Sequence, residues 1–185
     1  MKQEKITVFL SRPNPFLKEQ VLFLERLQKT LDELGIRTIT LQADNYDLSD
    51  SMNYLKGMIK RCYGIIVVAF RQYYIEKGFK KKGGLENPEF FYPQEIDVSG
   101  QALTSPYCQI EGTIGFINDL PLLILNEKGI REEGVLQGGR FCTKTDCFEL
   151  SNVEAFFSDK IVHQKIQIWA GKVFDNYLFL NLRKD

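Results

Sequence analysis

Glu111 is the residue of this chain whose type and position best fit catalytic chemistry. It ends the segment 105–111 (SPYCQIE), in which Ser followed by Pro is typical of the start of a helix. A helix that begins there carries Glu111 in its second turn, on the same face as Tyr107 and Cys108. A carboxylate in such a position can stabilise a ribosyl cation, bind a ribose hydroxyl or attack as a nucleophile. The same pattern also fits a solvated glutamate behind an ordinary helix start.

If one carboxylate cleaves a ribosyl–nitrogen bond without a second acid, NAD is the favoured substrate. Nicotinamide in NAD is a pyridinium cation, so it departs as a neutral molecule without a proton donor. A neutral nucleobase needs general acid catalysis as well, and an acid such as Glu95 or Asp97 would then have to approach Glu111. The single histidine, His163, falls in a C-terminal helical pattern, and we interpret it as a surface or packed residue. If Glu111 acts on such a bond, this chemistry favours NAD over a neutral nucleoside as the substrate, and no cofactor is predicted.

Alternating strands and helices must position this glutamate. Apolar or β-branched runs predict strands at 6–10, 37–41, 64–70 and 121–125, with a weaker strand at 147–150. Helical spacing of apolar residues predicts helices at 16–34, 48–59, 105–118 and 153–182, and Gly35 ends the first of them. The run 64–70 is apolar at every position, which is typical of a central parallel strand. We therefore expect one α/β domain over residues 1–185, with a doubly wound, mainly parallel five-stranded sheet flanked by helices.

The loops that follow the strands are the candidate binding segments, because ligands of doubly wound sheets bind beyond the carboxyl ends of the strands. Arg12 could meet a pyrophosphate, and an aromatic ring at Tyr74 could stack on nicotinamide or adenine. The segment 71–104 is an insert after the third strand, and its length and its aromatic run at 90–93 (FFYP) predict a functional loop or a short hairpin. The predicted substrate-binding residues are Ser11, Arg12, Phe16, Phe70, Arg71, Tyr74, Ser105 and Tyr107.

Composition excludes several classes of protein. Lys plus Arg and Asp plus Glu number 24 each, so there is no net charge to attract nucleic acid or an anionic membrane surface. No apolar run is long enough to span a bilayer, and the N-terminus does not resemble a signal peptide, so we expect a cytoplasmic protein. The four cysteines lack the paired CxxC spacing of a zinc site, and no metal is predicted.

The segment that carries Glu111 resembles the signature of the TIR (Toll/interleukin-1 receptor) domain family, in which a strand is followed by a Ser-x-Trp-Cys-x-x-Glu helix start. Ser105, Cys108 and Glu111 match this signature, and Tyr107 stands where the family usually has Trp. The run 6–11 (ITVFLS) is similar to the first strand of the family, and 64–70 to its third. The insert 71–104 departs from the family, whose loop there is usually short. Similar inserted forms occur among bacterial TIR-like proteins of antiphage defence and in the related nucleoside 2-deoxyribosyltransferases.

The resemblance implies a TIR/flavodoxin-like fold and an NAD glycohydrolase or ADP-ribosyl cyclase-type activity that depends on Glu111. It also implies that the product is ADP-ribose, or a cyclic or conjugated form of it, made as a signal on sensing phage. A separate effector protein would sense that product, and the active form would be a homo-oligomer. Two alternatives stay open, which are a nucleoside 2-deoxyribosyltransferase or nucleotide N-glycosidase, and a non-catalytic adaptor or nucleotide-binding module.

Overall fold

A sheet of five parallel strands forms the centre of the protein. The computed structural model describes residues 5–41, 51–84 and 94–182 of the chain. The strands are β1 (Ile6–Ser11), β2 (Ile36–Ile39), β3 (Ile65–Ala69), β8 (Leu122–Asn126) and β9 (Thr143–Lys144), in the order β2-β1-β3-β8-β9. Every residue of β3 and β8 is buried, as expected for central strands. The expected α/β fold with a five-stranded parallel sheet is therefore confirmed.

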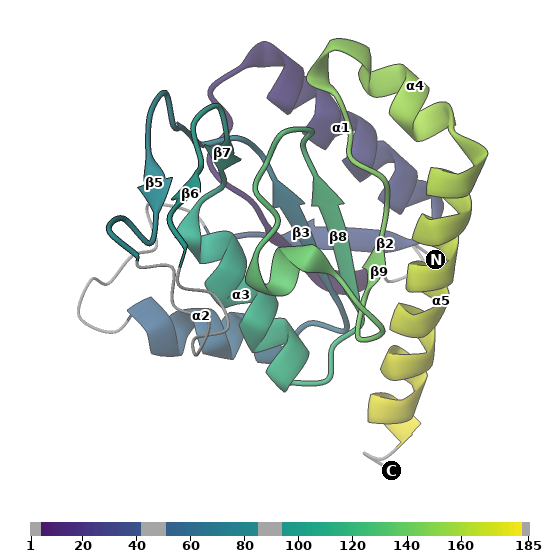
Figure 1. The fold of residues 1–185 in the computed structure, drawn as a ribbon. Coiled ribbons are helices and arrows are strands. Elements are labelled where there is room, and N and C mark those ends of the chain that lie inside the picture. The colour runs from purple at the N-terminus through teal and green to yellow at the C-terminus, as the bar shows by residue number, and fades with distance from the viewer. Residues whose placement is uncertain (1–4, 42–50, 85–93, 183–185) are drawn as a thin grey trace.

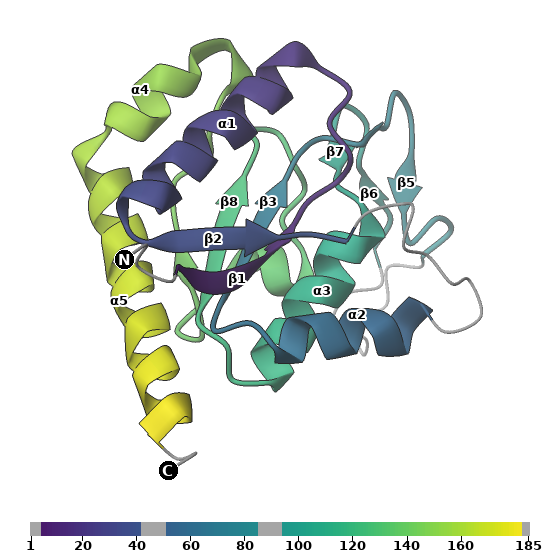
Figure 2. The same ribbon diagram turned by 180° about the vertical axis from the view of Figure 1, so that it is seen from behind.

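Helices cover both faces of this sheet (Figures 1 and 2). Those on one face are α1 (Lys18–Glu33), α4 (Val153–Ser158) and α5 (Lys160–Leu182), and those on the other are α2 (Ser51–Lys60) and α3 (Pro106–Ile117). Each face has its own apolar core. Phe23, Phe148 and Trp169 lie in the core under α1, α4 and α5, and Ile59 and Cys108 lie in the core under α2 and α3. The chain runs from β1 outward to β2 and then back to β3, so the strand order reverses between β1 and β3.

The insert after β3 forms two small antiparallel sheets at the carboxyl end of the main sheet (Figure 1). In the first, β4 (Tyr73–Tyr74) pairs with β7 (Ala102–Leu103), and in the second, β5 (Phe79–Lys80) pairs with β6 (Ile96–Asp97). The expected hairpin character of 71–104 is thus present, in two nested pairs instead of one. The aromatic run 90–93 lies outside the described residues.

The C-terminal third differs from the expectation in two places. The last strand is β9, at Thr143–Lys144, and the predicted strand at 147–150 is absent. Phe148 instead makes an isolated bridge with Glu127 and fills the core against Phe23, where the two rings stack at 4.0 Å between centroids. The predicted helix 153–182 is two helices, because Asp159 interrupts it and accepts hydrogen bonds from the first backbone amides of α5.

The remaining boundaries differ by a few residues. The helix expected from residue 16 begins at Lys18, because the side-chain oxygen of Gln20 accepts the backbone N–H groups of Phe16 and Leu17 outside the helix. Gly35 follows α1 with a φ of 71°, as expected of a glycine that ends a helix. The predicted helix at 48–59 is α2, and its expected first residues, 48–50, lie outside the described residues. Within the described ranges, no helix has the length and apolar character needed to cross a membrane.

Candidate functional site

Glu111 is held at the carboxyl edge of the sheet by the way α3 begins and packs. Ser105 caps the helix as predicted, and its hydroxyl accepts the backbone N–H of Tyr107 at 3.2 Å. Two glycines of this helix, Gly112 and Gly115, then let it approach β3 closely. A Cβ added at Gly115 would lie 2.6 Å from Ile65 Cγ2, which is closer than real Cβ atoms come to other atoms. The backbone that carries Glu111 is therefore fixed against the sheet.

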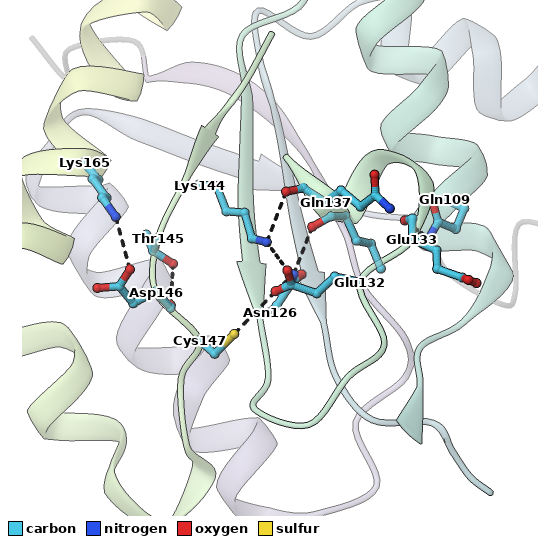
Figure 3. Close-up of polar contacts among 11 residues, drawn as sticks. Gln109, Asn126, Glu132, Glu133, Gln137, Lys144, Thr145, Asp146, Cys147 and Lys165 are labelled. Atoms are coloured by element: carbon cyan, nitrogen blue, oxygen red, sulfur yellow. Dashed lines mark hydrogen bonds and ion pairs between the residues drawn. The ribbon is translucent and has the colours of Figure 1, made fainter. Parts of the chain in front are cut away.

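The loop after β8 is tied to α3 and to β9 (Figure 3). The Gln109 side chain donates to the carbonyl oxygen of Glu133 at 2.8 Å and accepts the backbone N–H of Val135 at 3.1 Å. Directly before Glu133, Glu132 pairs with Lys144 at 2.5 Å and accepts a hydrogen bond from Asn126 at 2.8 Å. The Gln109 contacts thus fix the loop to the first turn of α3, and the Glu132 contacts fix it to β8 and β9.

Glu111 lines a cavity of about 200 Å³ at the carboxyl ends of β1 and β2. Its side chain reaches the cavity although the residue is only 5% exposed. The other walls come from the loop after β1 and the segment after β2. Four predicted site residues meet here, which are Arg12, Ser105, Tyr107 and Glu111, together with Thr40 and Leu41.

Burial and the neighbouring groups of this cavity act on the pKa of Glu111 in opposite directions. Burial raises the pKa of the Glu111 carboxyl to about 7, although the Ser11 hydroxyl and the Arg12 guanidinium both favour the ionised form. Burial likewise lowers the pKa of Arg12, and Glu111 opposes that shift. The Ser11 hydroxyl is fully buried and has no hydrogen-bond partner of good geometry within the described residues. The result is a carboxyl group whose charge responds to pH and to a bound cation near neutrality.

Cys108, next to Glu111 in the expected signature, does not have the properties of a nucleophile. The residue is fully buried, and burial raises the pKa of its thiol to about 11. Its sulfur contacts the hydroxyl of Thr104 at 3.7 Å. Cys108 therefore fills space in the core under α2 and α3.

A second cavity, of about 420 Å³, holds three more of the predicted residues, Phe16, Arg71 and Tyr74. Arg71 is anchored there by Glu127, which is buried and accepts the backbone N–H of Arg71 at 2.9 Å and its side-chain Nε at 2.5 Å. Gln20 and Tyr73 also line this cavity. Sequence analysis missed Gln20, Tyr73 and Glu127, and only Glu127 carried a signal, because it lies two residues after the predicted strand 121–125.

Phe70 is a correction to the predicted set. It is fully buried in the core under α1, where its ring meets Phe23 edge-on at 5.7 Å between centroids and Phe148 at 5.8 Å. It directly follows β3, and its side chain belongs to the core on the α1 face of the sheet. The structure therefore assigns Phe70 a packing role and removes it from the substrate contacts.

The acids expected for the first alternative lie elsewhere. Glu95 accepts the backbone N–H of Gly83 at 2.8 Å within the insert, and Asp97 is exposed in β6. Neither lines either of the two cavities. His163 is exposed on α5, next to Gln167. Within the described ranges, His, Cys, Asp and Glu side chains form no group of three or more that could hold a metal ion.

Comparison of the chain with protein-family models, with curated proteins and with solved structures finds no significant match.

Proposed function

We propose that this protein cleaves the nicotinamide–ribose bond of NAD or a related nucleotide, with Glu111 as the catalytic residue. The observation that carries the proposal is a nearly buried carboxyl group that faces a cavity at the carboxyl ends of β1 and β2, and β1 is one of the two strands between which the strand order of the parallel sheet reverses. Ligands of such sheets bind at this point. The resemblance of 105–111 to the TIR signature supports the same residue independently of its position in the cavity.

The reaction needs the ionised form of Glu111. As the glycosidic bond breaks, its electron pair moves to the pyridinium nitrogen, and nicotinamide leaves without charge. The anomeric carbon becomes cationic, and the carboxylate stabilises this charge at short range. A water molecule, or a nucleophilic atom of the same nucleotide in a cyclase reaction, then bonds to the anomeric carbon, and one proton is released.

Burial disfavours the ionised form of Glu111 when no ligand is bound, but it also strengthens the attraction between the ionised carboxylate and a cation. Burial, partly offset by Ser11 and Arg12, raises the pKa of the Glu111 carboxyl to about 7, so the group is largely protonated below that pH. A bound pyridinium cation favours the charged form of a neighbouring acid, so substrate binding itself ionises Glu111. Arg12 adds a positive charge at the cavity wall, suited to a phosphate group of the substrate. Ser105 and Tyr107 complete the wall around the sugar.

A nucleoside 2-deoxyribosyltransferase or nucleotide N-glycosidase is the second candidate. A carboxyl group with a pKa of about 7 is partly protonated at neutral pH and could donate a proton to a neutral base. That reaction also needs a group to stabilise the sugar cation. Of the described residues that line the cavity, Glu111 alone carries a carboxyl group. The balance therefore favours NAD, whose leaving group needs no proton.

The product and the partners follow from the TIR resemblance. In this proposal the product is an ADP-ribose-derived signal made in antiphage defence, a separate effector protein senses it, and several copies of the chain assemble on activation. A non-catalytic adaptor or nucleotide-binding module is the third reading, and it differs from the first two in tolerating the loss of the Glu111 carboxylate.

The test is incubation of concentrated protein with NAD and, separately, with pairs of deoxynucleosides and free bases, followed by mass spectrometry. Wild type, Glu111→Gln and the control Glu25→Gln, an exposed position on α1, are compared. Release of nicotinamide by wild type and the control, but not by Glu111→Gln, supports the proposal. Base exchange between deoxynucleosides would support the second candidate. Intact NAD with the assembled wild-type protein, over a range of concentrations, would overturn the proposal.

A further inference from the structure

The two cavities lie on either side of one short loop. Arg12 and Asn14 line the Glu111 cavity, and Phe16 and Leu17 line the second cavity. Neighbouring Cα atoms are about 3.8 Å apart, so the residues that divide the cavities, Asn14 and Phe16, are at most about 7 Å apart. A ligand with two ring systems joined by a flexible linker could therefore occupy both cavities and cross this loop.

The second cavity is rich in exposed aromatic rings. Phe16, Tyr73 and Tyr74 are 62%, 58% and 67% exposed. They come from two distant segments, the loop after β1 and strand β4 of the insert. Aromatic side chains around a cavity stack on flat heterocycles, and they do so with every nucleobase because each has a π face.

The floor of the second cavity holds a buried hydrogen-bond donor with no acceptor. Gln20 is fully buried, and its side-chain oxygen is used by the backbone N–H groups of Phe16 and Leu17. Its Nε2 has no partner within the described residues. A buried donor without a partner is unfavourable, and a ring nitrogen of a purine is an acceptor that would satisfy it after a small movement of the wall.

Arg71 gives this cavity a positive charge beside the rings. Glu127 holds its backbone N–H and its Nε, and the side chain is half exposed. A guanidinium fixed on one edge presents its other edge outward, which suits a phosphate oxygen. Arg12 stands on the other side of the loop.

We propose that the second cavity binds the adenine base of the dinucleotide substrate, stacked on Tyr74 and recognised by Gln20, while the nicotinamide riboside half lies at Glu111. This inference rests on the proposed function and deepens it by naming the second recognition site. The pyrophosphate then crosses the loop between the two arginines. An adenine nucleotide distinct from the substrate would satisfy the same chemistry, and the experiment separates the two sources.

Titration calorimetry with AMP and with nicotinamide mononucleotide, the two halves of NAD, tests the assignment. Tyr74→Ala should weaken AMP binding at least about fivefold, and the control Tyr74→Phe, which keeps the ring, should bind like wild type. Gln20→Glu keeps an acceptor for the two backbone N–H groups but removes the donor, and it should also weaken AMP binding. Neither change should alter the affinity for nicotinamide mononucleotide. Thermal unfolding of each variant checks that the fold is intact.

The outcomes separate this inference from the proposed function. AMP binding that is unchanged in Tyr74→Ala and in Gln20→Glu would overturn the inference, whatever happens to NAD. If AMP competes with NAD for cleavage, the base belongs to the substrate, as proposed. If AMP binds at Tyr74 but does not compete, the assignment to the substrate is wrong. Tyr74-dependent AMP binding without any cleavage of NAD would leave the purine site standing and would overturn the proposed function instead.

Discussion

The Glu111 carboxyl and the Arg12 guanidinium line the same small cavity, and each favours the charged form of the other. Burial opposes both charges and outweighs the attraction, because the pKa of Glu111 is raised and that of Arg12 is lowered. The pair is thus poorly stabilised in the empty cavity. A ligand that brings a phosphate to Arg12 and a cation to Glu111 would stabilise both at once.

The pH dependence of stability should report the buried acid. The pKa of Glu111 is raised to about 7, so the folded state binds more protons than the unfolded state between about pH 4.5 and 7. Stability contributed by the protonated form is therefore lost as pH rises through this window, by about 3 kcal/mol at most. Glu111→Gln should lack this loss. Denaturant unfolding of both proteins from pH 4 to 8 measures the difference, and parallel curves would contradict the assignment.

The rate of catalysis should rise over the same pH range in which the stability of the fold decreases. Cleavage of NAD requires ionised Glu111, so kcat/KM should increase with pH and level off above a midpoint of about 7. Ser11→Ala removes a group that favours the ionised form, so the midpoint should move to higher pH. Ser11 does not line the cavity, so its replacement should not remove a contact with the substrate. The midpoint of the pH profile of kcat/KM is therefore the quantity that reports its effect. A midpoint that stays in place would show that the Ser11 hydroxyl does not act on the titrating carboxyl, and a midpoint that persists in a Glu111→Asp variant with no shift would show that Glu111 is not the titrating group.

Gly115→Ala tests the close contact between α3 and β3. The new Cβ would lie 2.6 Å from Ile65 Cγ2, so the helix or the strand must shift, at a cost of about 1–3 kcal/mol in stability. Because the shift displaces the backbone near Glu111, kcat should fall as well. The matched control is Gly171→Ala on α5, where nothing lies within 4 Å and a gain of about 0.5–1 kcal/mol is expected. Equal unfolding free energies for the two variants would contradict the tight packing.

Alkylation should distinguish the four thiols. Burial raises the pKa of Cys62 to about 12 and that of Cys108 to about 11, so neither should react with iodoacetamide in the native protein at pH 8. Cys147 is exposed and Cys142 is partly exposed, so these two should react first. Mass spectrometry of digested protein gives the order, and labelling in urea should modify all four. Native labelling of Cys108 would contradict its place in the core.

Most of the fold could be predicted because the main strands and helices carry their signals within their own residues. The continuous apolar run at 64–70 identified the central strand, and Ser105 with Pro106 identified the start of α3. The errors came from residues whose role depends on distant partners. Phe148 contacts Phe23 of α1, so an apolar run that resembled a strand is a core anchor. Strand β9 is two residues long and exists through its pairing with β8, which leaves almost no signal in the sequence.

In the candidate site too, features with a local signal were predicted and features that depend on distant partners were not. Glu111 and its place between core and cleft were identified from a helix start and its spacing, but the depth of its burial was not, because that depends on how closely two glycines bring α3 to β3. Gln20 carried no signal, since a glutamine in an amphipathic helix is normally exposed, whereas here it is fully buried and bonded to the backbone of the preceding loop. Phe70 was misassigned because the end of an apolar strand does not reveal which face its last side chain joins.

Pro13 and Pro15 bracket the loop that separates the two cavities, and each fixes one backbone torsion of it. Pro13 is also buried, which anchors the loop to the body of the protein. Most of the conformational entropy of this segment is therefore lost when the chain folds, before any ligand arrives. A nucleotide that crosses the loop would bind to a segment that is already ordered, so its affinity would not be reduced by the entropy cost of ordering that segment. Exchange of either proline for alanine would make the loop more flexible and would weaken binding at both cavities together.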